Sequence, residues 1–198
     1  SFTPDFLLRI HQRLFERIYK HAGAYRTVNI SKKEWVLGGD TVMFSSYDML
    51  RETLEYDFEL EKRVDYNALN VDLAIKQICK FISGIWQIHP FREGNTRTTA
   101  VFTMKYLQTF GFTVNNDVFK DNSWYFRNAL VRANYKNLPK DIHSTSDYLE
   151  LFFRNLILGE KNVLSNRSML VFEFQSANKE VSKCQNGSLD CSLDELAV

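Results

Sequence analysis

The segment that decides the fold spans residues 70–97 and reads NVDLAIKQICKFISGIWQIHPFREGNTR. Its first part predicts a helix that begins after Asn70, because an asparagine side chain can accept hydrogen bonds from the free N–H groups of a helix start. Apolar residues occupy most faces of this helix, so we expect it at the centre of the domain. The helix must end near Ile88, since Pro90 disfavours helical geometry in the residue before it.

Patterns on both sides of this segment predict further helices and one hairpin. Residues 3–5 (Thr-Pro-Asp) carry the signals of a helix start, and Gly23 is placed to end that helix. Residues 35–44 predict a hairpin in which Gly38 and Gly39 supply positive φ angles. Additional helices are expected over residues 46–58, 95–111, 123–133 and 146–158. The predicted fold class is therefore all-α with one small β-hairpin.

Composition limits the class of protein. The chain has 198 residues, 44% of them hydrophobic, which is enough for the core of one domain. Its 25 basic residues balance 24 acidic ones, so we expect no nucleic-acid or anionic-membrane partner for this domain. No apolar run approaches the roughly 20 residues of a membrane-spanning helix, and residues 1–5 do not resemble a signal peptide. Three cysteines without a ligand or disulfide pattern suit a reducing compartment, so a cytoplasmic location is expected.

The hydrophobic pattern weakens toward the C-terminus, so we divide the chain into a core, residues 1–160, and a tail, residues 161–198. Near the end of the tail, Ser192 begins a helix-capping pattern just before the sequence stops. This pattern indicates either the start of a second domain or an ordinary frayed end. Cys184 and Cys191 either form a disulfide or remain free thiols.

The residues that follow the central helix suit phosphate chemistry. Gly94 and Asn95 stand at the start of the next helix, where backbone N–H groups and the helix dipole favour an anion. Arg97 lies one turn further on and can reach the same phosphates. Glu93 would repel a polyphosphate unless Mg²⁺ lies between them. His89 can take up a proton near neutral pH, so the segment offers an anion cradle, a metal carboxylate and a base.

Each of these residues also has a purely structural interpretation. His89 can serve only to cap the end of the preceding helix. Glu93 and Arg97 are four residues apart and can form a surface ion pair. Gly94-Asn95 is in itself an ordinary turn signal. These alternatives stay open from the residues alone.

The same segment resembles the motif of the Fic (filamentation induced by cAMP) family, His-x-Phe-x-(Asp/Glu)-Gly-Asn-Gly-Arg-x-x-Arg. In residues 89–97 the histidine, phenylalanine, glutamate, glycine, asparagine and first arginine match in register. Residues 10–32 are similar to the family's opening helix and to the segment that leads into its flap. The hairpin predicted at residues 35–44 stands where that flap belongs, and the likeness continues to about Leu158. The implied fold is a Fic-like helical bundle with a hairpin flap.

This resemblance implies transfer of AMP from ATP to a hydroxyl group on a protein, with release of pyrophosphate. His89 would deprotonate the target Tyr, Ser or Thr hydroxyl, Phe91 would anchor the loop in the core, and Glu93 would hold Mg²⁺. The residues implied to bind the phosphates are Gly94, Asn95, Thr96 and Arg97. ATP and Mg²⁺ are thus the expected substrate and metal.

The resemblance also implies that a target segment docks as an added strand on the flap. The implied docking residues are Val36, Leu37, Gly38, Gly39, Asp40, Thr41 and Val42. In the family, the second motif arginine contacts the γ-phosphate and pairs with an inhibitory glutamate. Residues 176–180 (Ser-Ala-Asn-Lys-Glu) have the spacing of that inhibitory segment, and an inhibitory partner is a further expectation.

Two positions depart from the motif. Thr96 replaces its second glycine, and Ala100 replaces its second arginine. Thr96 brings a hydroxyl into the expected anion hole, so altered contacts are expected there. Because Ala100 leaves the tail of a triphosphate less fixed, the same cradle can use another phosphate-containing donor. A second alternative to AMP transfer, a non-catalytic nucleotide-binding regulatory module, also stays open.

Overall fold

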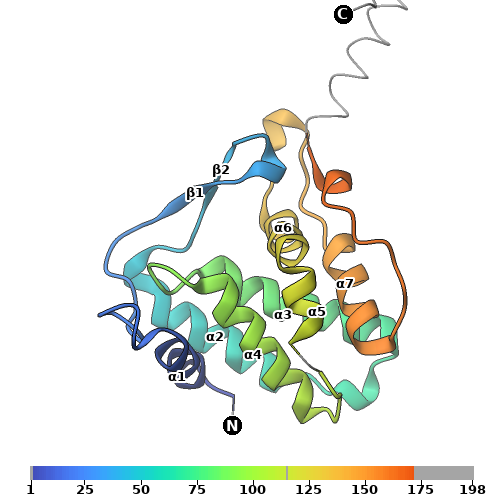
Figure 1. The fold of residues 1–198 in the computed structure, drawn as a ribbon, viewed down its shortest axis with the longest axis horizontal. Helices are drawn as coiled ribbons and strands as arrows, with labels where there is room; N and C mark the ends of the chain where they lie inside the picture. Colours follow the sequence, from blue (N-terminus) through green and yellow to red (C-terminus); the bar gives the residue numbers. More distant parts are fainter. Residues whose placement is uncertain (1, 115, 172–198) are drawn as a thin grey trace, which may run out of the picture.

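The computed structural model describes residues 2–114 and 116–171 (Figure 1). The central helix is α3 (Val71–Ile88). It begins after Asn70, whose side chain accepts a hydrogen bond from the N–H of Leu73 at 2.9 Å. Four helices pack against it: α2 (Leu50–Lys62), α4 (Asn95–Thr109), α6 (Ser123–Asn134) and α7 (Asp147–Leu158). The prediction of an all-α fold around this helix is confirmed.

Apolar and aromatic side chains fill the space between these helices. On α3, Cys79, Ile82 and Trp86 are completely buried, because four helices pack against this helix. Helix α1 (Pro4–Phe15) covers α4 and α2, and the short helix α5 (Asp117–Asp121), which the sequence did not predict, packs on α6. None of the helices in the described residues is long and apolar enough to cross a membrane.

Two predicted helix boundaries need correction. The first helix ends at Phe15 rather than at Gly23, and turns fill the interval. The reason is tertiary: the backbone N–H of Gly23 donates to Nδ1 of His11 at 2.8 Å, which folds the chain back on the helix it has just left. Ser46 does not cap α2, because the short 3₁₀ helix Tyr47–Met49 lies between them.

The predicted hairpin exists and its second strand lies within the predicted range, but its first strand lies earlier in the chain. Strand β1 (Ser31–Lys33) pairs antiparallel with β2 (Thr41–Met43), and Lys32 faces Val42 in the register. Between the strands, Trp35–Leu37 forms a 3₁₀ helix instead of the predicted strand. Val36 and Leu37 are completely buried, and burial of adjacent side chains on the same side favours a helical turn over a strand, which alternates. We refer to residues 31–43 as the flap.

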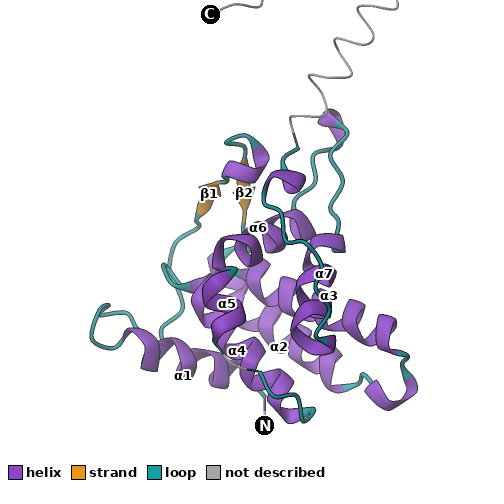
Figure 2. Cartoon of the chain, turned by 45° about the vertical axis from the view of Figure 1, so that its right-hand side comes forward, coloured by secondary structure: helices purple, strands orange, loops and turns teal. Residues whose placement is uncertain are grey.

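Polar contacts hold the flap against the helices. Asp40 accepts hydrogen bonds from the Tyr135 hydroxyl at 2.6 Å and from Lys140 Nζ at 2.7 Å, and the Lys140 bond is the largest cause of its lowered pKa. The Gln87 side chain donates to the Met43 carbonyl at 2.7 Å. Figure 2 shows the flap standing at one end of the helical bundle. It is therefore fixed both at its tip and at its second strand.

The described part of the predicted tail also packs on the core. The 3₁₀ helix Arg167–Met169 contacts α6, and the Met169 side chain is buried. The N–H of Val171 donates to the Val36 carbonyl of the flap at 3.3 Å. The expectations for Ser176–Glu180, Cys184, Cys191 and Ser192 lie outside the described residues.

Candidate active site

His89 ends α3 in a left-handed backbone conformation, with φ 52° and ψ 59°. Arg26 holds this conformation, because its Nε donates to the His89 carbonyl at 2.9 Å and its backbone N–H donates to the Pro90 carbonyl at 2.9 Å. The same guanidinium group donates to the carbonyls of Val28 and Ser45. Arg26, which is itself buried, thus ties the end of α3 to the segments on either side of the flap.

The ring of His89 has a defined proton position. Its Nδ1 lies 3.0 Å from the Trp86 carbonyl. A carbonyl can only accept, so Nδ1 carries the proton and Nε2 carries a lone pair. The ring stacks on Phe44 at a centroid distance of 3.7 Å. Burial lowers the pKa of His89 to about 3, and the charges of Lys32 and Arg127 act in the same direction. The imidazole is therefore neutral at physiological pH, and its Nε2 carries no proton.

The loop after His89 is closed by side chains that point into the protein. Asn95 accepts from the N–H of Phe91 at 2.9 Å and donates to the Phe91 carbonyl at 2.7 Å. Phe91 is buried and stacks on His11 at 3.8 Å. Because Gly23 donates to Nδ1 of His11, the other ring nitrogen carries the proton and donates to the Glu93 carbonyl at 3.0 Å. The Asn95 side chain thus shapes the loop, and only its backbone N–H is available to an anion.

A helix N-terminus with free N–H groups forms the cradle. Helix α4 begins after Gly94, which has φ 81° and gives no side-chain cap. The backbone N–H groups of the first turn, from Asn95 to Arg97, have no intrahelical partners and favour a bound anion. A Cβ atom at Gly94 would lie 2.5 Å from the ring of Phe15, so only glycine fits this approach.

The two departures from the Fic motif have different structural consequences. The Thr96 hydroxyl accepts a hydrogen bond from the Trp86 indole N–H at 3.0 Å, so Thr96 is tied to the core. Ala100 lines a second cavity of about 510 Å³, together with apolar residues such as Val101 and Met104. Lys120 is the other cation, besides Arg97, that lines this second cavity.

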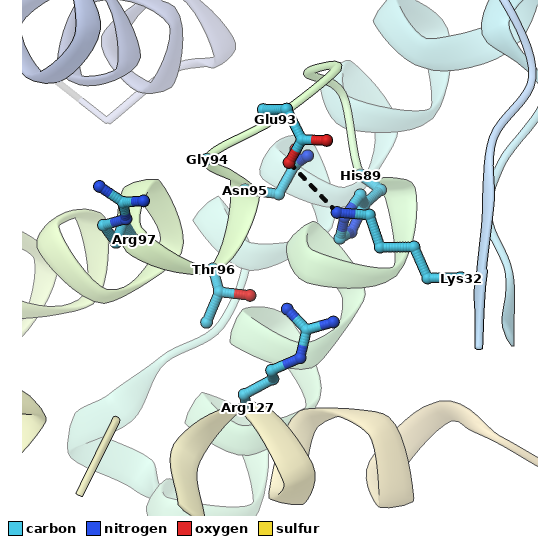
Figure 3. Close-up of a pocket in the computed structure, with 8 residues that line it drawn as sticks. All are labelled: Lys32, His89, Glu93, Gly94, Asn95, Thr96, Arg97 and Arg127. Carbon is cyan, nitrogen blue, oxygen red and sulfur yellow. Dashed lines mark hydrogen bonds and ion pairs between the residues drawn. The ribbon is translucent and has the colours of Figure 1, made fainter. Parts of the chain in front are cut away.

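The motif residues meet in a polar pocket of about 130 Å³ between α4, α6 and the flap (Figure 3). Glu93 lies 3.4 Å from Lys32 Nζ, and Figure 3 shows both groups beside His89. Arg97 is directed away from His89 and lies over the Phe15 ring at 5.3 Å. The lining residues are Lys32, His89, Glu93, Gly94, Asn95, Thr96, Arg97 and Arg127.

Comparison with known proteins places this arrangement in a family. Residues 1–107, more than half of the chain, match the family model described as the Fic/DOC family. The chain belongs to the Fic/DOC family. It is 26% identical over 118 residues to the protein adenylyltransferase VbhT of Bartonella schoenbuchensis and 25% identical over 123 residues to a protein adenylyltransferase of Bartonella henselae. These matches cover 59% and 58% of the chain, but it spans only 23% of the length of either relative.

Solved structures share the Fic fold. The N-terminal Fic domain of Bep8 from Bartonella sp. 1-1C superposes with a TM-score of 0.62 at 19% identity, covering 79% of this chain and 74% of that one. The BepC protein of Bartonella tribocorum, crystallised with AMPPNP, gives a TM-score of 0.58 at 19% identity with the same coverage. A Fic domain of Bartonella quintana with bound ADP gives 0.61 at 18% identity, covering 79% and 73%.

Some residues of this Fic site were not predicted from the sequence. Arg26, His11, Arg127 and Lys32 come from segments that lie far from the motif in sequence. Their side chains form contacts across 30 or more residues, for which no local spacing exists. The available signal was Arg26, an arginine shortly before the predicted hairpin. Its burial is what marks it as part of the site, and composition does not reveal burial.

Acid is expected to destabilise this Fic domain through His89. An unfolded chain binds a proton at a histidine near pH 6.5, whereas the folded domain binds one at His89 only near pH 3. Between these values the unfolded state holds more protons, so the free energy of unfolding falls as the pH falls, by up to about 1.4 kcal/mol per pH unit. His11, whose pKa is lowered mainly by burial, adds to this trend. Urea unfolding at a series of pH values from 7.5 to 4 measures this pH dependence of the free energy of unfolding.

His89→Asn is the matched variant for this measurement, since asparagine tolerates a left-handed backbone. We expect its unfolding free energy to depend less steeply on pH than that of the wild type between pH 6.5 and 4. Parallel profiles for the two proteins would show that His89 is not the titrating group.

Proposed function

We propose that this chain is a protein adenylyltransferase that moves AMP from ATP to a Tyr, Ser or Thr hydroxyl of a target protein. One observation carries the proposal: the neutral His89, with its lone pair on Nε2, lines the same pocket as the anion cradle at the start of α4. The names of the two Bartonella relatives and the AMPPNP and ADP in similar Fic structures support it.

The chain's own residues suit each part of such a transfer. Nε2 of His89 takes the proton of the target hydroxyl, and the hydroxyl oxygen forms a bond to the α-phosphorus of ATP. The bond from that phosphorus to the oxygen bridging the α- and β-phosphates breaks, and pyrophosphate leaves with the electron pair. The cradle N–H groups of Asn95 and Thr96 stabilise the negative charge, and Arg97 borders the cradle.

Glu93 fits the role of the metal carboxylate. Among the residues that line the pocket it is the single acidic one, and Mg²⁺ bound to nucleotides often uses one or two protein carboxylates plus phosphate oxygens. When bound, Mg²⁺ neutralises phosphate charge. Lys32, 3.4 Å from Glu93, must move or share that carboxylate when the metal binds.

We further propose that the target docks along the flap by strand addition. Of the docking residues expected from the sequence, Val36, Leu37 and Val42 have buried side chains, so there the backbone rather than the side chains contacts the target. Gly38 and Gly39 are exposed at the tip of the flap.

The division of the chain into a core of residues 1–160 and a tail stays a proposal, as does the cytoplasmic location.

Label transfer tests the proposal. The protein is incubated with a cell lysate, Mg²⁺ and either [α-³²P]ATP or [γ-³²P]ATP, with and without EDTA. We expect label on protein from the α-phosphate alone, and its loss on metal removal. The absence of both labels, with intact protein, would contradict AMP transfer.

Label from the γ-phosphate instead would favour a second candidate, phosphate transfer by the same cradle. The observation behind this candidate is Ala100, which stands at the position of the motif's second arginine and offers no charge to the end of a triphosphate.

A further inference from the structure

Arg127 lines the motif pocket, although it lies outside the motif. It projects from α6 toward the space in front of Thr96, on the wall opposite the motif loop (Figure 3). Its position one turn beyond Trp124 places it on the side of α6 that packs against the 3₁₀ helix of the flap. The pocket therefore has a cation on its far wall.

Glu34 fixes the orientation of this arginine. Its carboxylate accepts from Nε of Arg127 at 3.2 Å and from Nη2 at 2.7 Å, and the Glu34 side chain is only 2% exposed. A guanidinium group has five N–H donors, and this two-pronged pair uses two of them. The Arg127 side chain is 27% exposed and borders the pocket. Such a pre-oriented group binds a phosphate with little loss of side-chain entropy.

The other cations of the pocket are engaged differently. Lys32 pairs with Glu93, and Arg97 lies over Phe15 on the other side of the α4 N-terminus. The position of the motif's second arginine is Ala100. The cradle holds one phosphate, so a donor with two or more phosphates carries further negative charge outside the cradle. Arg127 is the oriented cation that faces this charge from the wall opposite the cradle.

We propose that Arg127 is a phosphate-binding residue of the donor site, which contacts a second phosphate of the donor while the cradle of α4 holds the first. The inference rests on the proposed function in taking a nucleotide with two or more phosphates as the donor. The structural alternative is that the Glu34–Arg127 pair serves only to fix the flap.

Calorimetric titration with AMP, ADP, ATP and inorganic tripolyphosphate separates these roles. We expect Arg127→Gln to weaken the binding of ATP, ADP and tripolyphosphate at least about tenfold, because these ligands have a second phosphate. The binding of AMP, which has one phosphate, should weaken less than about twofold. Lys140→Gln is the matched control, because it also removes one cation that pairs with a flap carboxylate, in this case Asp40 near the tip of the flap. We expect it to change none of the affinities more than about twofold.

Arg127→Gln leaves the Glu34 carboxylate buried without its partner, so its folding must be checked by thermal unfolding. The double variant with Glu34→Gln and Arg127→Gln avoids a buried unpaired charge and should lose the same affinities. The inference is wrong if either folded variant binds ATP and tripolyphosphate as tightly as the wild type. It is also wrong if the affinity of either folded variant for AMP falls by as large a factor as its affinity for ATP.

The same titration distinguishes this inference from the proposed function. Tripolyphosphate binding that depends on Arg127, in a protein that binds no adenine nucleotide, would support the inference and contradict AMP transfer from ATP. Unchanged nucleotide binding in Arg127→Gln, together with α-label transfer, would overturn the inference alone. A wild type that binds neither tripolyphosphate nor ATP would overturn both.

Discussion

Replacing His89 by alanine is expected to lower the rate of AMP transfer by about 10²–10⁴-fold, the usual contribution of a positioned general base. In the folded protein the Trp86 carbonyl fixes the Nδ1 proton, which leaves the lone pair on Nε2, the atom that we propose takes the proton of the target hydroxyl. Alanine removes that lone pair. Initial rates of [α-³²P] label transfer, with nucleotide binding measured in parallel, give the effect on chemistry separately from binding.

His89→Asn is the second variant, because alanine adds strain at a backbone with φ 52° and asparagine does not. Both variants should retain nucleotide binding within about threefold, since the cradle consists of backbone groups on α4. Transfer that persists at the wild-type rate in folded His89→Asn would remove His89 from the role of base.

Gly94→Ala is expected to lower the free energy of unfolding by about 2–6 kcal/mol and to abolish binding of phosphate ligands. Two effects combine: strain from a positive φ, about 1–3 kcal/mol, and overpacking of a buried site, also about 1–3 kcal/mol. The new Cβ would lie 2.5 Å from the Phe15 ring, which is itself almost completely buried, so the loop must move. Urea unfolding and ATP titration measure the two consequences.

Gly159→Ala supplies the control for Gly94→Ala. Gly159 has φ +69° and no atom within 4 Å of an added Cβ, so it reports backbone strain without a clash. We expect a loss of about 1–2 kcal/mol there and no change in ATP affinity. Equal losses for the two variants would mean that Phe15 yields freely and that the close approach at Gly94 is not what shapes the cradle.

Local signals were enough where neighbouring residues set the structure. The asparagine cap at residue 70, the apolar faces of α3 and the stop before Pro90 predicted the central helix and its end. The motif loop belongs to the same class, because Gly94 and Asn95 act through their own backbone and through contacts four residues away. The hairpin was predicted in the right region, but its first strand lies earlier in the chain than predicted, since Val36 and Leu37 look equally suited to a strand and to a buried turn.

The sequence by itself determined the helical fold and the Fic-type motif, and it predicted candidate residues for a base, a carboxylate and a phosphate cradle, since these depend on contacts within a few residues. Only the tertiary structure decided the lowered pKa of His89, the packing of Phe15 against Gly94 and the presence of Arg26, Lys32 and Arg127 around the loop. These depend on burial and on contacts between segments far apart in sequence. Side-chain burial and long-range pairing arise from how the helices pack, and no local pattern of residues encodes which distant side chain will face a given pocket.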